Sequence, residues 1–246
     1  MTNIFDNLHI GAAPTGIGAQ TSGGFGFGPI GRIYIYDIVP LALNAAAYAA
    51  SQSPGSAKAV TLSAGTGVTK STYQGLTIYS ADVPRAVTIT SGADESANTI
   101  TIKGFDTYGA AMTQSLAGGA TGTVTTTKAF KSIYSVTSSA NFSGTITVGT
   151  ADVFGFPVAV VDAGYIIHAG WAETLADNAG TFVAAVATTA SATTGDVRGT
   201  YAQAGAASNG TRRLVVSIAL SDLNIGGDTQ TTNSQTVVGV LGVTQF

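Results

Sequence analysis

The chain has 246 residues, ten Lys and Arg, thirteen Asp and Glu, and a formal net charge of −3. Hydrophobic residues make up 45% of it, which excludes global disorder. The few basic residues form no stripe that could neutralise phosphates, so we expect no nucleic acid partner. The lack of cysteine excludes disulfides and thiolate metal sites. Because charged residues are only 9%, either uncharged polar side chains keep the protein soluble or an assembly buries much of its surface.

Residues 1–31 are rich in glycine and begin without the basic and apolar regions of a signal peptide. Phe25 and Phe27 alternate with glycines here, which is compatible with a flexible leader or with an arm that orders against a neighbouring subunit. We favour the arm, because a solvated tail gains nothing from two phenylalanines. Residues 26–31 match G-x-G-x-x-G, but no strand precedes and no helix follows them, so we expect no bound nucleotide.

A strand is predicted from Arg32 to Val39, where isoleucines face one side and tyrosines the other. Both faces are apolar or aromatic, which is typical of a central strand or of a strand at an interface. We therefore expect Tyr34 and Tyr36 to contribute to an interface with another chain. The alanine-rich residues 41–50 predict a short helix, too short to cross a bilayer, so no membrane partner is expected. Residues 51–56 contain Pro and Gly and mark the first boundary.

Short threonine-rich runs alternate with Gly, Asn and Asp turns from residue 57 to residue 157. This rhythm predicts a β-sandwich or barrel, and the missing helical patterns argue against a parallel α/β fold. Residues 92–97 are expected to be a hairpin loop, and Asp106–Gly109 a turn. The expected strands are Ala59–Ser63, Gly75–Ser80, Ala86–Ser91, Asn98–Gly104, Ala111–Leu116, Gly122–Thr127, Phe130–Thr137, Gly144–Val148 and Phe154–Val161.

A second group of apolar runs follows residue 157 and predicts a separate β unit. The long polar loop 221–235 within it should be exposed. The 32–39 strand is a candidate to join the sheet of this unit. The expected strands are Tyr165–Trp171, Thr181–Ala187, Asp196–Tyr201 (a polar strand or a turn), Arg213–Leu220 and Thr236–Val243.

The predicted architecture is therefore all-β, with antiparallel strands in a β-sandwich or jelly-roll-like fold. It has two β units and an extended N-terminal arm. The expected divisions are an arm with one strand and a short helix (1–56), a β-sandwich domain (57–157) and a C-terminal β unit (158–246).

No catalytic motif stands out, because the chain has no GxSxG, HExxH or P-loop sequence and only two histidines, His9 and His168. A lone histidine in an alternating strand is usually a packed or surface residue. Asp94–Glu95 leaves a paired-carboxylate glycosidase site open, although aromatic residues to line its groove are few. Residues 222–227 resemble half of a calcium loop, but position twelve is Asn233 instead of glutamate. We expect no enzyme, no cofactor and no bound metal.

Three arginines are rare charges beside predicted strands, namely Arg198, Arg212 and Arg213. Arg198 is placed to pair with Asp196 or with a partner chain. We expect these arginines, together with Trp171, the only tryptophan, to anchor an interface with another chain.

Three motifs follow one another in the middle of the chain. They are the D-x-x-G turn at Asp106–Gly109, the T-K-A-F-K-x-I strand at Thr127–Ile133 and the V-G-T-x-D-x-x-G-x-P segment at Val148–Pro157. In this order they resemble virion structural proteins of tailed bacteriophages. The resemblance covers roughly residues 76–246 and extends to Asp196–Tyr201, Ser208–Val216 and Leu241–Phe246.

The resemblance implies a non-enzymatic component of a virus particle, with no catalytic residues to transfer. The expected function is that of a capsid decoration (cement) protein, which binds the outside of the shell and staples neighbouring capsomers. Its partners would be the major capsid protein and copies of itself, most plausibly as a trimer, and its location the capsid exterior of the virion. The alternatives are a head fibre or tail protein, and a carbohydrate-binding adhesion module that would use Trp171 with Tyr165.

Overall fold

The computed structural model describes residues 32–172, 180–186 and 190–220 of the chain. The regular structure of these residues is almost entirely antiparallel β-sheet, and their helical structure is limited to two short 3-10 turns, η2 (Gly55–Ala57) and η3 (Ala163–Tyr165). The predicted all-β, sandwich-like fold is therefore confirmed.

The described strands include two that are unusually long. β4 and β7 have 16 and 17 residues, and each spans two of the predicted strands. Shifts in the register between them bend these strands without ending them. In chain order the strands are β1 (Arg32–Ile38), β2 (Ala49–Gln52), β3 (Val68–Tyr73), β4 (Leu76–Ser91), β5 (Thr99–Phe105), β6 (Ala111–Ala117), β7 (Gly122–Ser138), β8 (Ile146–Gly155), β9 (Ile166–Trp171), β10 (Thr181–Val183), β11 (Thr200–Ala202) and β12 (Leu214–Leu220).

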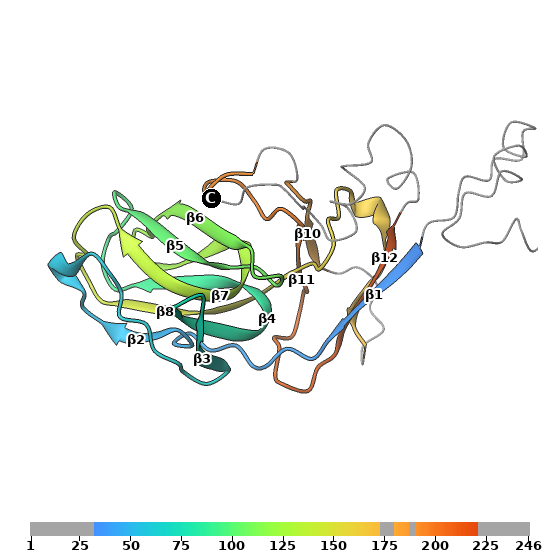
Figure 1. The fold of residues 1–246 in the computed structure, drawn as a ribbon, viewed down its shortest axis with the longest axis horizontal. Helices are drawn as coiled ribbons and strands as arrows, with labels where there is room; N and C mark the ends of the chain where they lie inside the picture. Colours follow the sequence, from blue (N-terminus) through green and yellow to red (C-terminus); the bar gives the residue numbers. More distant parts are fainter. Residues whose placement is uncertain (1–31, 173–179, 187–189, 221–246) are drawn as a thin grey trace, which may run out of the picture.

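The larger sheet has nine strands and curls around the main core (Figure 1). Its order is β10-β11-β8-β4-β7-β5-β6, while β2 adds to β8 and β3 adds to β4. Alternation explains which side chains enter the core: Ile100 and Ile102 of β5 are fully buried, whereas Thr99 and Lys103 are exposed. The same core takes Val87 from β4 and further apolar residues from β7 and β8.

The smaller sheet has three strands in the order β1-β12-β9 and lies at one end of the described structure (Figure 1). Its inner face and the end of β8 enclose a second core, which includes Tyr36, Phe154, Trp171 and Val216. β1 pairs with β12 over its full length, from Arg32 opposite Leu220 to Ile38 opposite Leu214. The 32–39 strand thus joins the C-terminal strands, as predicted, whereas β10 and β11 extend the larger sheet through β8.

The predicted helix over residues 41–50 is wrong. These residues form an irregular segment with a turn, followed by β2. The Asn44 side chain organises the turn, because its Oδ1 accepts a hydrogen bond from the Ala46 amide at 2.9 Å and its Nδ2 donates to the Thr66 carbonyl. Tyr48 then enters the main core, with its amide bonded to the Val148 carbonyl. Packing against the sheet therefore overrides the helix propensity of alanine.

The predicted hairpin across residues 92–97 is also wrong, because β4 and β5 do not pair; β7 lies between them. The buried Glu95 carboxylate holds the connection instead. It accepts hydrogen bonds from the amides of Ser143 at 2.6 Å and Gly144 at 3.0 Å and from the Asn98 side chain at 2.5 Å. Asp94–Glu95 is thus not a pair of carboxylates facing one site, since Glu95 is 1% exposed and used in the fold.

Further strand predictions differ from the structure: of the predicted strand Phe154–Val161, only Phe154 and Gly155 belong to a strand, β8. No strand was predicted at β3, a mostly exposed strand that pairs with the start of β4. The predicted strand Ala59–Ser63 makes only an isolated bridge, from Ala59 to Thr137. The strand predicted over Thr236–Val243, the half calcium loop 222–227 and the glycine motif 26–31 lie outside the described residues.

Candidate functional site

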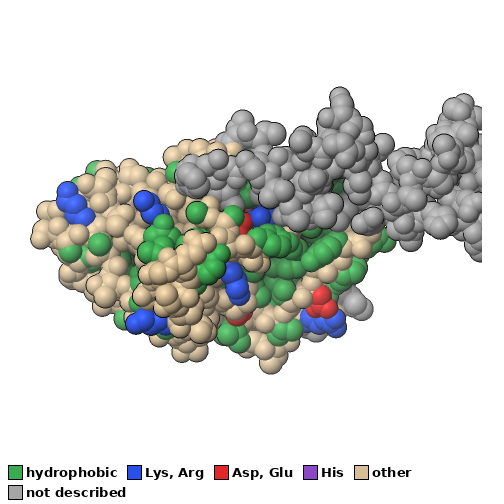
Figure 2. Space-filling view, viewed as in Figure 1, with side chains coloured by type: hydrophobic (Ala, Val, Ile, Leu, Met, Phe, Trp, Pro, Cys, Tyr) green, Lys and Arg blue, Asp and Glu red, His purple; other side chains and the backbone are tan. Residues whose placement is uncertain are grey.

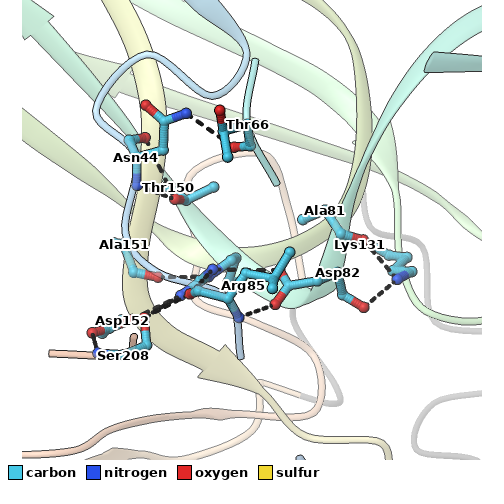
Figure 3. A network of polar contacts seen from close by, with 11 residues as sticks. Asn44, Thr66, Ala81, Asp82, Arg85, Lys131, Thr150, Ala151, Asp152 and Ser208 are labelled. Atoms are coloured by element: carbon cyan, nitrogen blue, oxygen red, sulfur yellow. Dashed lines mark hydrogen bonds and ion pairs between the residues drawn. The ribbon is translucent and has the colours of Figure 1, made fainter. Parts of the chain in front are cut away.

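Arg85, a buried arginine on β4, connects the two sheets (Figure 3). Its side chain lies beneath the segments that lead out of β1 and into β12, and it stacks on the Phe154 ring, 5.3 Å from the centroid. Its acceptors are the Ala151 carbonyl at 3.2 Å, the Leu41 carbonyl at 3.1 Å, Asp82 at 3.3 Å, Asp152 at 2.7 Å and the Ser208 hydroxyl at 3.1 Å. We call Leu41, Asp82, Arg85, Asp152 and Ser208 the junction cluster.

The junction cluster is structural in its chemistry. A guanidinium has five N–H donors, and the five contacts of Arg85 match that number, so the geometry leaves no donor for a ligand. Asp152 also accepts from the amide and hydroxyl of Ser208, both at 2.7 Å. Lys131 donates to the carbonyls of Ala81 and Asp82. Buried charges of this kind are retained only when they are paired, and here the pairing fastens the smaller sheet to the larger one.

A second polar cluster lies where the 106–109 turn meets the 190–200 segment. Arg198 forms an ion pair with Asp106 at 2.8 Å and lies over the ring of Tyr108 at 4.8 Å. Asp106 also accepts from the amides of Tyr108 and Ala110, which makes the predicted D-x-x-G turn. Asp196 accepts from the amides of Ala129 and of Arg198 itself. The 190–200 segment is thereby fixed to β7 and to the turn after β5.

Burial is the largest cause of the pKa shifts of Asp196 and Lys128 in and beside this second cluster. It raises the pKa of the Asp196 carboxyl above its usual range, against the hydrogen bonds and positive charges around it. It also lowers the pKa of Lys128 to about 8, although Asp196 acts in the opposite direction. Lys128 donates to the Thr113 carbonyl at 2.9 Å, deep between β6 and β7. These contacts run to neighbouring strands and turns, and they hold β6 and the 190–200 segment against β7.

Metal binding finds no support in the part of the chain that the structure describes. No three His, Asp or Glu side chains come together there as metal ligands. His168 lies half-buried on β9, opposite Ser217 of β12.

Three of the eight residues expected at an interface are inside the chain. Tyr36 and Trp171 belong to the second core, and Trp171 donates from its indole nitrogen to the Ala206 carbonyl at 2.9 Å. Arg198 is buried and forms an ion pair with Asp106 of its own chain. The expectation that these three side chains are surface anchors is therefore corrected, because each is used to hold this chain together.

The other five interface candidates have different positions. Tyr34 is 37% exposed, and Arg213 is exposed but pairs with Asp37 of β1. Arg212 is half-buried and donates to the Ala207 carbonyl. Phe25 and Phe27 lie outside the described residues. For these five residues the interface remains a prediction.

Exposed apolar side chains concentrate on the smaller sheet and the segment that follows β1. Ile33 and Ile35 are 55% and 53% exposed, and Ile167 of β9 is 55% exposed. Val39, Leu41 and Leu43 continue the exposure along the chain. Figure 2 shows hydrophobic side chains gathered over this end of the described structure. In the described part of the chain, β1 pairs with β12 on one side only. We use the term β1 edge for its other, unpaired side together with the side chains of Ile33, Tyr34 and Ile35.

The sequence contained a signal for the junction cluster that its apolar periodicity does not reveal. Asp82 and Arg85 stand in the middle of an apolar and threonine-rich run, and charges inside a strand are almost never buried unless paired. That pattern indicates a buried partner, but it does not identify Asp152 or Ser208. The exposed isoleucines of β1 could not be recognised either, because a strand with two apolar faces is typical of a buried strand.

Comparison with known proteins adds no relative: no family model matches the chain, and neither a curated protein nor a solved structure matches it. Among the described residues, no helix has the length and apolar character needed to cross a membrane.

Proposed function

We propose that this protein is a non-enzymatic structural component of a virus particle, of the capsid decoration type. The observation that carries the proposal is the β1 edge, an exposed apolar strand on a sheet whose other face is core. Contiguous exposed apolar surface of this kind marks sites of contact with other proteins. The proposal that the contact occurs in a virus particle rests on the resemblance of residues 76–246 to phage virion proteins.

The distribution of charge supports a role in assembly. The buried charged side chains of the two polar clusters bond to the chain itself, and the surface has few charges to spare, since charged residues are 9% of the sequence. The centres of protein interfaces are depleted in charged residues. A component that repeats over a lattice also needs only modest contacts, because multivalency adds their strength.

The carbohydrate-binding alternative loses its main support. It depended on Trp171 and Tyr165 as an aromatic platform, but Trp171 is 2% exposed and packs edge-on against Phe154, with ring centroids 6.4 Å apart. A buried indole cannot stack on a sugar. A head fibre or tail protein remains the second candidate, because the β1 edge would serve an assembly in either place.

Electron cryo-microscopy of virions that contain the protein tests the proposal. Dense, symmetric coverage of the outer shell is the result expected of a decoration protein whose partner is the major capsid protein. Density confined to the tail or to one vertex would move it to the second candidate. Its absence from purified virions would refute a particle role altogether.

A binding assay with shells that lack the protein tests the predicted arm. We expect full-length protein to cosediment with such shells and a truncation that lacks residues 1–31 to cosediment less. Circular dichroism on the truncation checks that the β structure is retained. Equal binding by both proteins would remove the arm, with Phe25 and Phe27, from the proposal.

A further inference from the structure

β1 is an edge strand of the smaller sheet, and its outer side meets no other strand within the described residues. An edge strand presents alternate N–H and C=O groups without partners, and natural proteins usually protect such edges with charges, bulges or short length. β1 has seven residues, and its pairing with β12 runs without a register shift. It is therefore a long and regular edge.

The other sheet edges in the described chain are protected. β10 has only three residues, and β3 carries Lys70 in its middle. The Ser115 amide of β6 is covered, since it donates to the Ala192 carbonyl at 2.7 Å. On β9 the register shifts at Ile167, which leaves a bulge. β1 differs from these edges because it is neither short nor bulged, and its charged residues, Arg32 and Asp37, stand toward its two ends.

The side chains of β1 make the edge self-complementary. Ile33 and Ile35 share the outer face of the sheet, and each is more than half exposed. The acid on this strand, Asp37, is held by Arg213 of the same chain, so its charge is neutralised beside the strand. Two identical apolar edges can therefore approach without like charges meeting at their centre.

We propose that β1 pairs antiparallel with β1 of a second copy of this chain, about a two-fold axis at Tyr34. Directly opposite residues of antiparallel strands lie on the same face. The axis at Tyr34 places Ile33 opposite Ile35 of the partner subunit, and the reverse, so that four isoleucines cluster on the outer face. An axis at Ile35 would instead place Ile33 opposite the carboxylate Asp37 of the partner subunit, which is less favourable.

This pairing joins two three-stranded sheets into one six-stranded sheet. Seven residues of strand are about 23 Å long at ~3.3 Å per residue. A contact along one such edge is smaller than the roughly 800 Å² per partner of a standard stable interface. The free protein should therefore dimerise weakly. The pairing deepens the proposed function and rests on it for one point, the high local concentration of copies on a shell, which would drive the pairing to completion.

A single cysteine tests the geometry, because the chain has none of its own. In the full chain, Tyr34→Cys places two thiols opposite each other at the two-fold axis. The Cα atoms of opposite residues lie about 4.5–5.5 Å apart, within the range that a disulfide spans. We expect oxidation to convert most of Tyr34→Cys to a covalent dimer. Ile167→Cys, an even more exposed position on the opposite edge strand of the same sheet, is the control and should remain monomeric.

Sedimentation velocity supplies an independent readout. Wild-type protein should show reversible dimerisation in a series up to several hundred micromolar, and Ile35→Lys should weaken it at least tenfold. Ile167→Lys should dimerise as the wild type does. Thermal unfolding of each variant shows whether it is folded.

Failure to crosslink Tyr34→Cys would overturn the pairing, as would equal crosslinking of Ile167→Cys. The first of these results is also the one expected if the chain's own residues 1–31 or 221–246 cover the edge. These experiments use only the free protein. A dimer with no protein in virions would thus refute the proposed function alone, and virion coverage without a crosslink would refute the pairing alone.

Discussion

The two sheets of this chain use isoleucine in opposite ways. In the nine-stranded sheet Ile100, Ile102 and Ile133 are fully buried, because the sheet curls and encloses its own core. In the three-stranded sheet Ile33 and Ile35 face outward and remain more than half exposed. Among the described residues, the smaller sheet therefore packs on the second core with one face only, and Ile33 and Ile35 stay exposed on its other face. The larger sheet therefore supplies most of the buried core, and the smaller sheet carries the exposed isoleucines on which the proposed contacts with other chains rest.

The junction between the sheets shows how such a small layer is held. Three strands with one buried face bury little apolar area, so their position depends on more than the second core. The junction cluster adds five hydrogen bonds from one guanidinium to segments that flank β1 and β12 as well as to β4 and β8. Removing that connection should therefore have the largest effect of any single change.

Replacing Arg85 with methionine should lower the free energy of unfolding by about 3–5 kcal/mol, because it leaves Asp82 and Asp152 partly buried without their counter-charge. Urea unfolding followed by tryptophan fluorescence measures the change, and Trp171 reports from the second core. Arg213→Met is the matched control. Its ion pair with Asp37 is exposed, so a far smaller change is expected. Equal losses in the two variants would show that the junction cluster does not hold the sheets together.

The sequence predicts the features of the two sheets that depend on neighbouring residues better than those that depend on residues far apart in the chain. The strand pattern gave the all-β class and most strand positions, since the alternation of apolar and polar residues is local, as at Ile100 and Ile102. It could not show that β7 lies between β4 and β5, because that depends on pairings between residues far apart in the chain, from Phe105 with Ser132 upward, that no local turn signals. The conformation of residues 41–50 is likewise determined by packing against the sheet and not by the helix propensity of alanine.

The candidate surface was only partly predictable. Tyr34 and Tyr36 were placed at an interface because both faces of their strand are apolar, yet Tyr36 is buried, whereas Ile33 and Ile35 of that strand are exposed. Which face of β1 is exposed depends on how its sheet packs against the second core. That packing involves β12 and β9, which lie far from β1 in the sequence. Arg198 was expected to face a partner for its rarity alone, but its partner is Asp106, about ninety residues away.

Replacing Gly104 with alanine should reveal how tightly the nine-stranded sheet is closed. A Cβ on Gly104 would overlap the Ser132 carbonyl oxygen of β7 and lie 2.9 Å from the Phe130 ring, so β5 must shift. Overpacking of this kind costs about 1–3 kcal/mol, and chemical denaturation measures it. Gly119→Ala is the control, because its nearest neighbour would be 3.4 Å away. A fully stable Gly104→Ala would mean that the two strands are less closely packed than described.

One buried tyrosine in each core gives a matched comparison of the two regions. The hydroxyls of Tyr48 in the main core and Tyr36 in the second core are buried, and neither has a hydrogen-bond partner among the described residues. An unsatisfied buried hydroxyl costs free energy, so Tyr48→Phe and Tyr36→Phe should each be neutral or stabilising by up to about 1 kcal/mol. Thermal unfolding measures both.

Tyr201→Phe is the control for these two changes, because the Tyr201 hydroxyl donates to Gln203 at 2.8 Å. We expect it to lose about 0.5–1.5 kcal/mol. Destabilisation of Tyr36→Phe but not of Tyr48→Phe would locate a partner for the hydroxyl in the second core and make that core the more polar one.

The smallest expected effect concerns the exposed ion pair beside the β1 edge. The hydrogen bond and charge of Arg213 hold the pKa of the Asp37 carboxyl below its ordinary value of 3.8. Since the pKa is lowered on folding, the pair stabilises the protein above pH 3.8 and that contribution is lost as the pH falls through the lowered value. Arg213→Gln should return the pKa of Asp37 toward 3.8, as carboxyl chemical shifts followed by NMR titration would show. It should leave stability at the acid end of the titration unchanged. An unchanged Asp37 pKa would mean that Arg213 does not neutralise the charge of Asp37 beside β1.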